Sequence, residues 1–174
     1  RSAAPGSPSS CPQPRMADAV PENLSETVHA SCVVIGGFGV LIRGPSGSGK
    51  STLARRLLEL STQRGHSSAL IGDDRVILTR KDDTLVAEGH PAIRGMIEVR
   101  GLGIGTTKVA PEAVIRLLAD CNSVLGSRFP DADERVGSVL GISLQRITVT
   151  PDSADLVLVA LGFSPVKIRS CEDL

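Results

Sequence analysis

The segment GPSGSGKS at residues 44–51 constrains the fold of this chain more than any other feature. It matches the pattern G-x-x-x-x-G-K-[ST], in which main-chain N–H groups, a lysine and a hydroxyl surround the phosphates of a nucleotide. Apolar residues 40–42 precede it, and Leu53, Leu57 and Leu60 follow at near-helical spacing. This context predicts a strand, a phosphate-binding loop and a helix over residues 51–64. A nucleoside triphosphate is the expected ligand.

The loop supplies most of the expected nucleotide contacts, and Ser51 is also expected to bind Mg²⁺. The expected nucleotide-binding residues are Gly44, Pro45, Ser46, Gly47, Ser48, Gly49, Lys50, Ser51 and Thr52. Thr52 suits the first turn of the helix better than the role of a ligand. The alternative interpretation is a chance glycine loop, or a phosphate site that does not hydrolyse nucleotide.

Length and charge narrow the class of protein. A chain of 174 residues predicts one domain, here residues 16–174, because residues 1–15 are rich in Pro, Ser and Gly and are expected to form a disordered leader. The 19 basic and 19 acidic side chains argue against binding to nucleic acid or an anionic membrane, which needs a basic excess. Four cysteines without a C-x-x-C pair fit reduced thiols in the cytoplasm.

The remaining pattern predicts mainly strands. Residues 27–35 and 40–42 read as two strands joined by a glycine turn, and further strands are expected over 68–71, 75–79, 84–87, 96–100 and 141–150. Residues 152–161 suit a short terminal helix. Residues 110–121 fit either a helix that begins at Pro111 or a buried strand.

Two adjacent carboxylates follow the apolar strand at residues 68–71. Asp73 and Asp74 are placed where nucleotide kinases hold Mg²⁺ and act on the acceptor hydroxyl. Side chains of adjacent residues point apart, so we expect different roles for the two. A solvated Asp-Asp turn is the simpler alternative.

The segment EVRGLGI at residues 98–104 resembles the signature of bacterial HPr kinase/phosphorylase, which phosphorylates and dephosphorylates a serine of the phosphocarrier protein HPr. Residues 28–30, 73–76 and 134–137 agree with further family elements in the same order. By length the chain resembles the short alphaproteobacterial form, which consists of the kinase domain alone. The resemblance implies an α/β P-loop domain of the HPr kinase and phosphoenolpyruvate carboxykinase-like type, with mixed sheets and few helices, and it makes residues 114–119 a strand.

The same resemblance implies roles for individual residues. Asp74 would act as general base in the kinase direction and as general acid in the reverse direction, helped by a charged His29. Ser51 would have a magnesium role, with Glu98 near the metal. From their own chemistry, Asp73 is a further candidate to hold Mg²⁺, and Arg135 is a candidate to contact the transferring phosphate as a planar donor. ATP and Mg²⁺ are the implied cofactors, and an HPr-like carrier and a homo-oligomer are the implied partners.

From the residues alone, simpler interpretations stay open: a strand histidine for His29, a surface ion pair for Glu98 and Arg100, and a solvated arginine for Arg135. Because Glu98 and Arg100 are two residues apart on a predicted strand, both would face one side, toward the site. Two other functions also fit the phosphate loop, a small-molecule kinase and a nucleotide-dependent signalling module. This chain also departs from the family at Thr52, where an acidic residue is usual, and toward its C-terminus.

Overall fold

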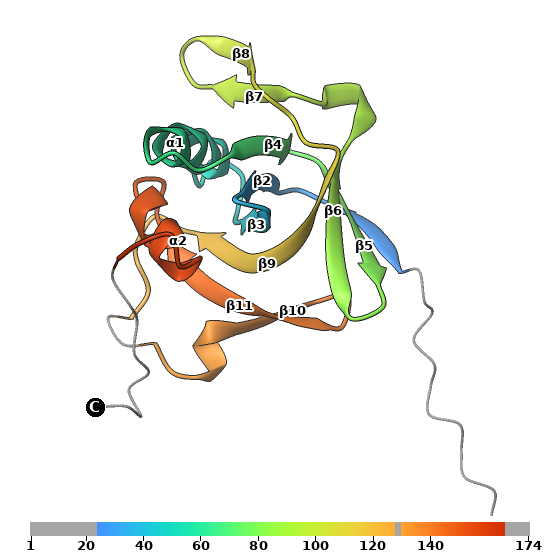
Figure 1. The fold of residues 1–174 in the computed structure, drawn as a ribbon, viewed down its shortest axis with the longest axis vertical. Coiled ribbons are helices and arrows are strands. Elements are labelled where there is room, and N and C mark those ends of the chain that lie inside the picture. Colours follow the sequence, from blue (N-terminus) through green and yellow to red (C-terminus); the bar gives the residue numbers. More distant parts are fainter. Residues whose placement is uncertain (1–23, 128–129, 166–174) are drawn as a thin grey trace, which may run out of the picture.

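The fold is built around one long strand, β9 (Glu112–Cys121), in a computed structural model that describes residues 24–127 and 130–165 (Figure 1). The first residues of β9 pair antiparallel with strand β6 (Thr84–Gly89). Its later residues pair parallel with β3 (Phe38–Arg43) on one edge and with β11 (Ile142–Val149) on the other. β9 thus joins an antiparallel layer to a mixed central layer.

The nine-stranded sheet runs in the order β1-β5-β6-β9-β3-β2-β4, and the β10–β11 hairpin joins it at β9. The other strands of this sheet are β1 (Ser25–Val28), β2 (Ser31–Ile35), β4 (Ser68–Gly72), β5 (Val76–Lys81) and β10 (Val136–Val139). A separate hairpin consists of β7 (Met96–Val99) and β8 (Gly103–Thr106). The helical elements are α1 (Lys50–Gln63), α2 (Ala154–Ala160) and the 3-10 turns η1 (Pro91–Ile93) and η2 (Asp133–Arg135).

Two hydrophobic clusters lie on the two faces of the central strands. Helices α1 and α2 cover one face, where Leu53 and Leu57 of α1 are fully buried against β2, β3 and β9. The antiparallel strands β5 and β6 cover the other face with Leu78 and Leu85. The strands at the centre are therefore apolar on both faces, which explains their nearly continuous hydrophobic sequence.

The expected α/β fold with mixed sheets is confirmed, and the described residues contain two α-helices. The helix after the phosphate loop, the short helix near residue 154 and the predicted strands other than the one over residues 27–35 occur within a few residues of their expected positions. The ambiguous segment at residues 110–121 contains a strand, β9, from Glu112 to Cys121. A strand buried on both faces lacks the alternation that distinguishes strand from helix, which is why its sequence was ambiguous.

One expected strand, over residues 27–35, is corrected to two. The chain pairs with β5 as β1, bends at His29 and Ala30, and then enters the central layer as β2. Strands β8 and β10 were not expected, because short glycine-containing strands carry little periodicity. The predicted leader, residues 1–15, lies outside the described residues. Across the described ranges, no helix is both long and apolar enough to cross a membrane.

Candidate active site

The phosphate loop turns tightly because Gly44, Gly47 and Gly49 have φ angles of 148°, 81° and 95°, which residues with a side chain rarely adopt. Two of these glycines also touch neighbouring chain segments. A Cβ atom on Gly44 would lie 2.3 Å from the carbonyl oxygen of Cys121, and one on Gly49 would lie 2.3 Å from Cγ of Pro151. The loop leads into the N-terminus of α1, whose free N–H groups and dipole favour an anion.

Lys50 lies at the centre of the site and is 6% exposed. Its ammonium group donates to the carbonyl oxygens of Gly44 and Pro45, at 3.0 and 3.1 Å, and contacts Nε2 of His29 at 3.1 Å. An ammonium group carries three hydrogens and no lone pair. The three contacts therefore use all of its donors, and they require Nε2 of His29 to act as an acceptor.

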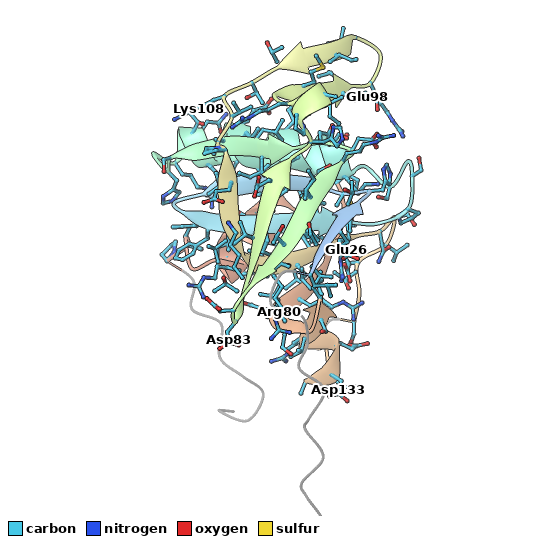
Figure 2. The ribbon with its side chains drawn as sticks, turned by 90° about the vertical axis from the view of Figure 1, so that its right-hand side faces the viewer. Glu26, Arg80, Asp83, Glu98, Lys108 and Asp133 are labelled. Carbon is cyan, nitrogen blue, oxygen red and sulfur yellow. The ribbon has the colours of Figure 1, made fainter. Side chains whose placement is uncertain are left out.

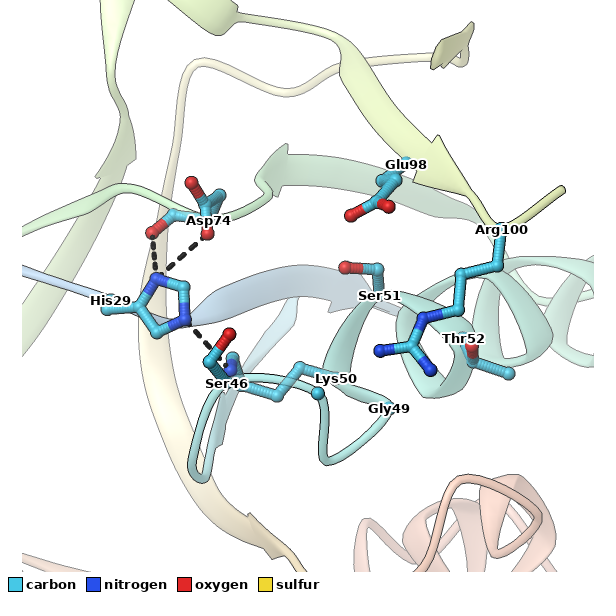
Figure 3. Close-up of a pocket in the computed structure, with 10 residues that line it drawn as sticks. His29, Ser46, Gly49, Lys50, Ser51, Thr52, Asp74, Glu98 and Arg100 are labelled. Carbon is cyan, nitrogen blue, oxygen red and sulfur yellow. Dashed lines mark hydrogen bonds and ion pairs between the residues drawn. The ribbon is translucent and has the colours of Figure 1, made fainter. Parts of the chain in front are cut away.

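His29 links this lysine to Asp74, as Figure 3 shows. Its Nδ1 lies 2.8 Å from Oδ1 of Asp74 and 3.1 Å from the Asp74 carbonyl oxygen. If Nε2 accepts from Lys50, the ring is neutral and Nδ1–H donates to Asp74. This hydrogen-bond pattern differs from the charged His29 that the family resemblance implies.

Asp74 occupies a strained position at the mouth of the site. Its φ angle is 70°, in the left-handed region that only Asp, Asn and Gly visit readily, and its side chain is 64% exposed. Strained residues of this kind cluster at functional sites. The bend after β4 thus presents the Asp74 carboxylate to solvent beside His29.

Asp73, in contrast, points inward and is 4% exposed. Its Oδ1 accepts hydrogen bonds from the Ser31 and Ser51 hydroxyls, at 2.5 and 2.9 Å, and its Oδ2 accepts from the Glu98 backbone N–H at 3.2 Å. A buried carboxylate needs such donors to offset its lost hydration. The two adjacent side chains therefore point into different surroundings, as expected for neighbouring residues, and their separate roles stay a prediction.

The expected magnesium ligands lie together. Ser51 and Glu98 line one pocket. Asp73 is not among the lining residues, but its carboxylate accepts hydrogen bonds from the Ser51 hydroxyl and the Glu98 backbone N–H. These are oxygen donors, which Mg²⁺ prefers, and the ion is commonly held by one or two carboxylates together with substrate phosphates. The described residues contain no cluster of three or more acidic, His or Cys side chains that would form an all-protein cage. Ser51 and Glu98 thus offer the pocket oxygen donors of the kind that Mg²⁺ takes.

Arg100 reaches the loop from the hairpin on the opposite side of the pocket (Figure 3). One of its terminal nitrogens lies 3.5 Å from the position that a Cβ atom on Gly47 would take. Within the described part of the chain, this guanidinium makes no hydrogen bond or ion pair. Sequence reasoning placed Arg100 on the face of Glu98 but assigned it no role.

The structure collects most of the expected site residues in this pocket. Its lining residues are His29, Ser46, Gly47, Gly49, Lys50, Ser51, Thr52, Asp74, Glu98 and Arg100. Arg135 is not among them. It lies in η2, at the end of the molecule opposite Glu98, as the position of the neighbouring Asp133 in Figure 2 shows, and its Nε donates to the Pro130 carbonyl oxygen at 3.0 Å. The single chain does not bring Arg135 to the pocket.

Three residues that support the site were missed. Ser31 donates to Asp73, Cys121 donates from Sγ to the Ser48 carbonyl oxygen at 3.3 Å, and Pro151 packs on Gly49. Burial raises the pKa of the Cys121 thiol, which therefore stays protonated and able to donate. No local pattern marks these residues, because each is far along the chain from the loop it supports.

Comparisons of the chain with a family model, with curated proteins and with solved structures all match HPr kinases. Residues 22–124 match the model of the family described as HPr serine kinase C-terminal domain. The HPr kinase/phosphorylase of Mycoplasma mycoides is 33% identical over 151 residues, which is 79% of this chain and 46% of the relative. That of Neisseria meningitidis is 40% identical over 155 residues, or 78% of this chain and 47% of the relative.

Among solved structures, the HPr(Ser) kinase/phosphatase of Coxiella burnetii superposes with a TM-score of 0.62 at 26% identity. The match covers 79% of this chain and 94% of that chain. The chain spans about half the length of the curated relatives named above.

Proposed function

The chain belongs to the family of HPr serine kinase C-terminal domains, and from this premise we propose that it transfers the γ-phosphoryl group of ATP to a serine of an HPr-like carrier protein. We propose in addition that it reverses this modification. The observation that supports the proposal most directly is the arrangement of Lys50, His29 and Asp74 across the mouth of the phosphate loop.

In the forward direction the loop and Lys50 hold the β and γ phosphates. Lys50 exchanges its contacts with the Gly44 and Pro45 carbonyl oxygens for phosphate oxygens. Ser51, Asp73 and Glu98 would hold Mg²⁺, which would supply positive charge to offset that of the phosphates. Arg100, whose guanidinium faces the loop, adds planar donors for the γ-phosphate.

Asp74 acts on the acceptor. As the serine oxygen forms its bond to the γ-phosphorus, the bond between that phosphorus and the β,γ-bridging oxygen breaks and ADP leaves. The serine proton passes to the Asp74 carboxylate. His29 orients this carboxylate through its contact at 2.8 Å.

In the reverse direction an oxygen of inorganic phosphate attacks the phosphorus of phosphoserine. The bond from phosphorus to the serine oxygen breaks, pyrophosphate forms, and Asp74 returns a proton to the serine oxygen. One carboxylate serves both directions because the same proton moves in opposite senses.

A labelling experiment tests the function. The protein is incubated with γ-labelled ATP, Mg²⁺ and an HPr protein, alongside an HPr whose regulatory serine is replaced by alanine. Label on wild-type HPr alone is the expected result. Absence of label from both proteins would overturn the proposal.

Two substitutions test phosphoryl transfer and ATP binding separately. Asp74→Asn is expected to abolish transfer while leaving nucleotide binding intact, since Asp74 lies at the mouth rather than in the loop. Lys50→Ala is expected to weaken ATP binding itself. Unchanged transfer in the first variant would remove Asp74 from the mechanism, and an unaltered ATP affinity in the second would contradict the loop assignment.

A further inference from the structure

The hairpin of β7 and β8 forms a sheet separate from the main one and lies beyond α1 and β4 at one end of the molecule (Figure 1). It is anchored at its base, where Ile97 is 5% exposed and belongs to the cluster under α1. The Glu98 N–H also donates to Asp73. The outer end of the hairpin consists of the turn at residues 100–102 and the first residues of β8, Gly103 and Ile104.

This outer end carries two large apolar side chains that are almost fully exposed. Leu102 is 89% exposed and Ile104 is 73% exposed, and no large hydrophobic among the described residues exceeds Leu102 in exposure. One exposed apolar residue needs no explanation. Two at the outer end of one hairpin, Leu102 in the turn and Ile104 early in β8, form a small apolar surface, which we call the hairpin tip and define as these two residues.

The hairpin tip and part of the pocket lining belong to the same hairpin. Ile104 lies directly opposite Glu98 in the register of the two strands, so both side chains face the same side of the hairpin. Arg100, which also lines the pocket, is two residues before Leu102. The rim of the pocket and the hairpin tip are therefore parts of one element.

We propose that the hairpin tip is a docking edge for the protein that carries the target serine, and that it binds apolar side chains next to that serine. The inference rests on the proposed function. A serine side chain is short, so its hydroxyl reaches the Asp74 carboxylate only if the backbone of the acceptor lies at the rim of the pocket. The acceptor then meets the hairpin that carries Glu98 and Arg100.

The size of the hairpin tip favours this occupant over a second copy of the chain. Two aliphatic side chains supply roughly 100 Å² of apolar surface each. A stable interface needs about 800 Å² from each partner, whereas weak, transient encounters bury less. The tip alone is too small to hold a dimer together, but it suits a substrate protein that must leave after each turnover.

The test compares three variants with the wild type. Leu102→Ser/Ile104→Ser removes the apolar surface, and Leu102→Met/Ile104→Val retains it. Val136→Ser, on β10 near the opposite end of the molecule, controls for the loss of an exposed apolar side chain, since Val136 is 52% exposed. All of these positions are exposed, so unchanged thermal unfolding is expected and is measured first.

Kinetics with HPr as the acceptor give the first readout. The serine double variant is expected to raise KM for HPr at least tenfold with kcat and ATP affinity unchanged, while the other two variants stay within twofold of the wild type. A wild-type KM in the serine variant would overturn the inference even though transfer itself, and so the proposed function, stood. A fall in ATP affinity with KM for HPr unchanged would show a nucleotide lid instead and would equally overturn it.

Direct binding gives the second readout and does not depend on catalysis. HPr is titrated into each protein without nucleotide, and molar mass is measured by light scattering. Loss of HPr binding in the serine variant alone supports docking, even if no phosphoryl transfer occurs and the proposed function fails. Equal binding by all four proteins, no binding by the wild type, or a lower mass of the serine variant, which would indicate self-association, would each contradict the inference.

Discussion

At the scale of single residues, the hydrogen bonds among Lys50, His29 and Asp74 depend on which ring nitrogen of His29 carries the hydrogen. Lys50 can only donate, so its contact with His29 determines the tautomer of the ring, and the ring in turn determines how Asp74 is held. The buried Asp73 next to it contacts different partners and faces the interior. The two adjacent aspartates therefore differ in burial and in hydrogen-bond partners.

We expect the His29 ring to be neutral, with hydrogen on Nδ1 and none on Nε2. Nitrogen chemical shifts of the ring in the nucleotide-free protein at neutral pH distinguish the tautomers. Hydrogen on Nε2 would contradict the contact with Lys50. The same spectrum of Lys50→Met is the control, because without the lysine the ring is free to exchange tautomers.

Arg100 is expected to act on the γ-phosphate. Because its guanidinium faces the loop without a partner among the described residues, Arg100→Ala should slow transfer about a hundredfold, the usual effect of removing one such donor. ATP affinity should fall while ADP affinity stays unchanged. Single-turnover rates and nucleotide titrations measure both, with Arg94→Ala as a control that removes an exposed positive charge outside the pocket lining. Transfer at the wild-type rate would exclude the role.

At the scale of elements, segments from the C-terminal part of the sequence pack against the phosphate loop. The end of β9 lies against Gly44, and the turn before α2 lies against Gly49. The α2 region is held to α1 by the ion pairs Arg56–Asp152 and Arg64–Asp155. The position of the loop therefore depends on the C-terminal helix as well as on its own glycines.

Replacing Gly49 by alanine should be more damaging than the same change at Gly47. Both residues have positive φ angles, but only at Gly49 would the new Cβ atom collide with Pro151. Overpacking of this kind costs about 1–3 kcal/mol of unfolding free energy. Chemical denaturation and ATP titration measure the difference. Adding Pro151→Gly to Gly49→Ala should restore part of both values, and the absence of any recovery would show that the contact with Pro151 is unimportant.

At the scale of the whole molecule, two cores on the two faces of the central strands stabilise the fold. Cys32 and Cys121 are fully buried, one in each core. Burial raises the pKa of both thiols, because the thiolate would lose its hydration. In the unfolded chain these thiols ionise near pH 8.5.

Stability should therefore fall as the pH rises above about 8.5. There the unfolded state releases thiol protons that the folded state retains, so the free energy of unfolding decreases by at most about 1.4 kcal/mol per pH unit for each thiol. Denaturation of the wild type and of Cys32→Ala between pH 7.5 and 9.5 measures the slope, which should be shallower in the variant. Equal slopes would mean that Cys32 does not contribute.

The sequence alone determined the phosphate loop, the helix after it, the paired aspartates and the position of most strands. These features are local: a glycine pattern or a hydrophobic period is complete within about fifteen residues of chain. The same limitation explains the error at residues 27–35, where local β propensity continues through His29 although the chain changes layers there.

Only the tertiary structure decided which distant residues meet. It placed His29 between Lys50 and Asp74, Ser31 on Asp73, Arg100 over the loop and Pro151 behind it, and it left Arg135 at the far end. Such contacts depend on the pairing and register of strands from different parts of the chain. No property of a local segment specifies that pairing, because it results from how all the segments pack together.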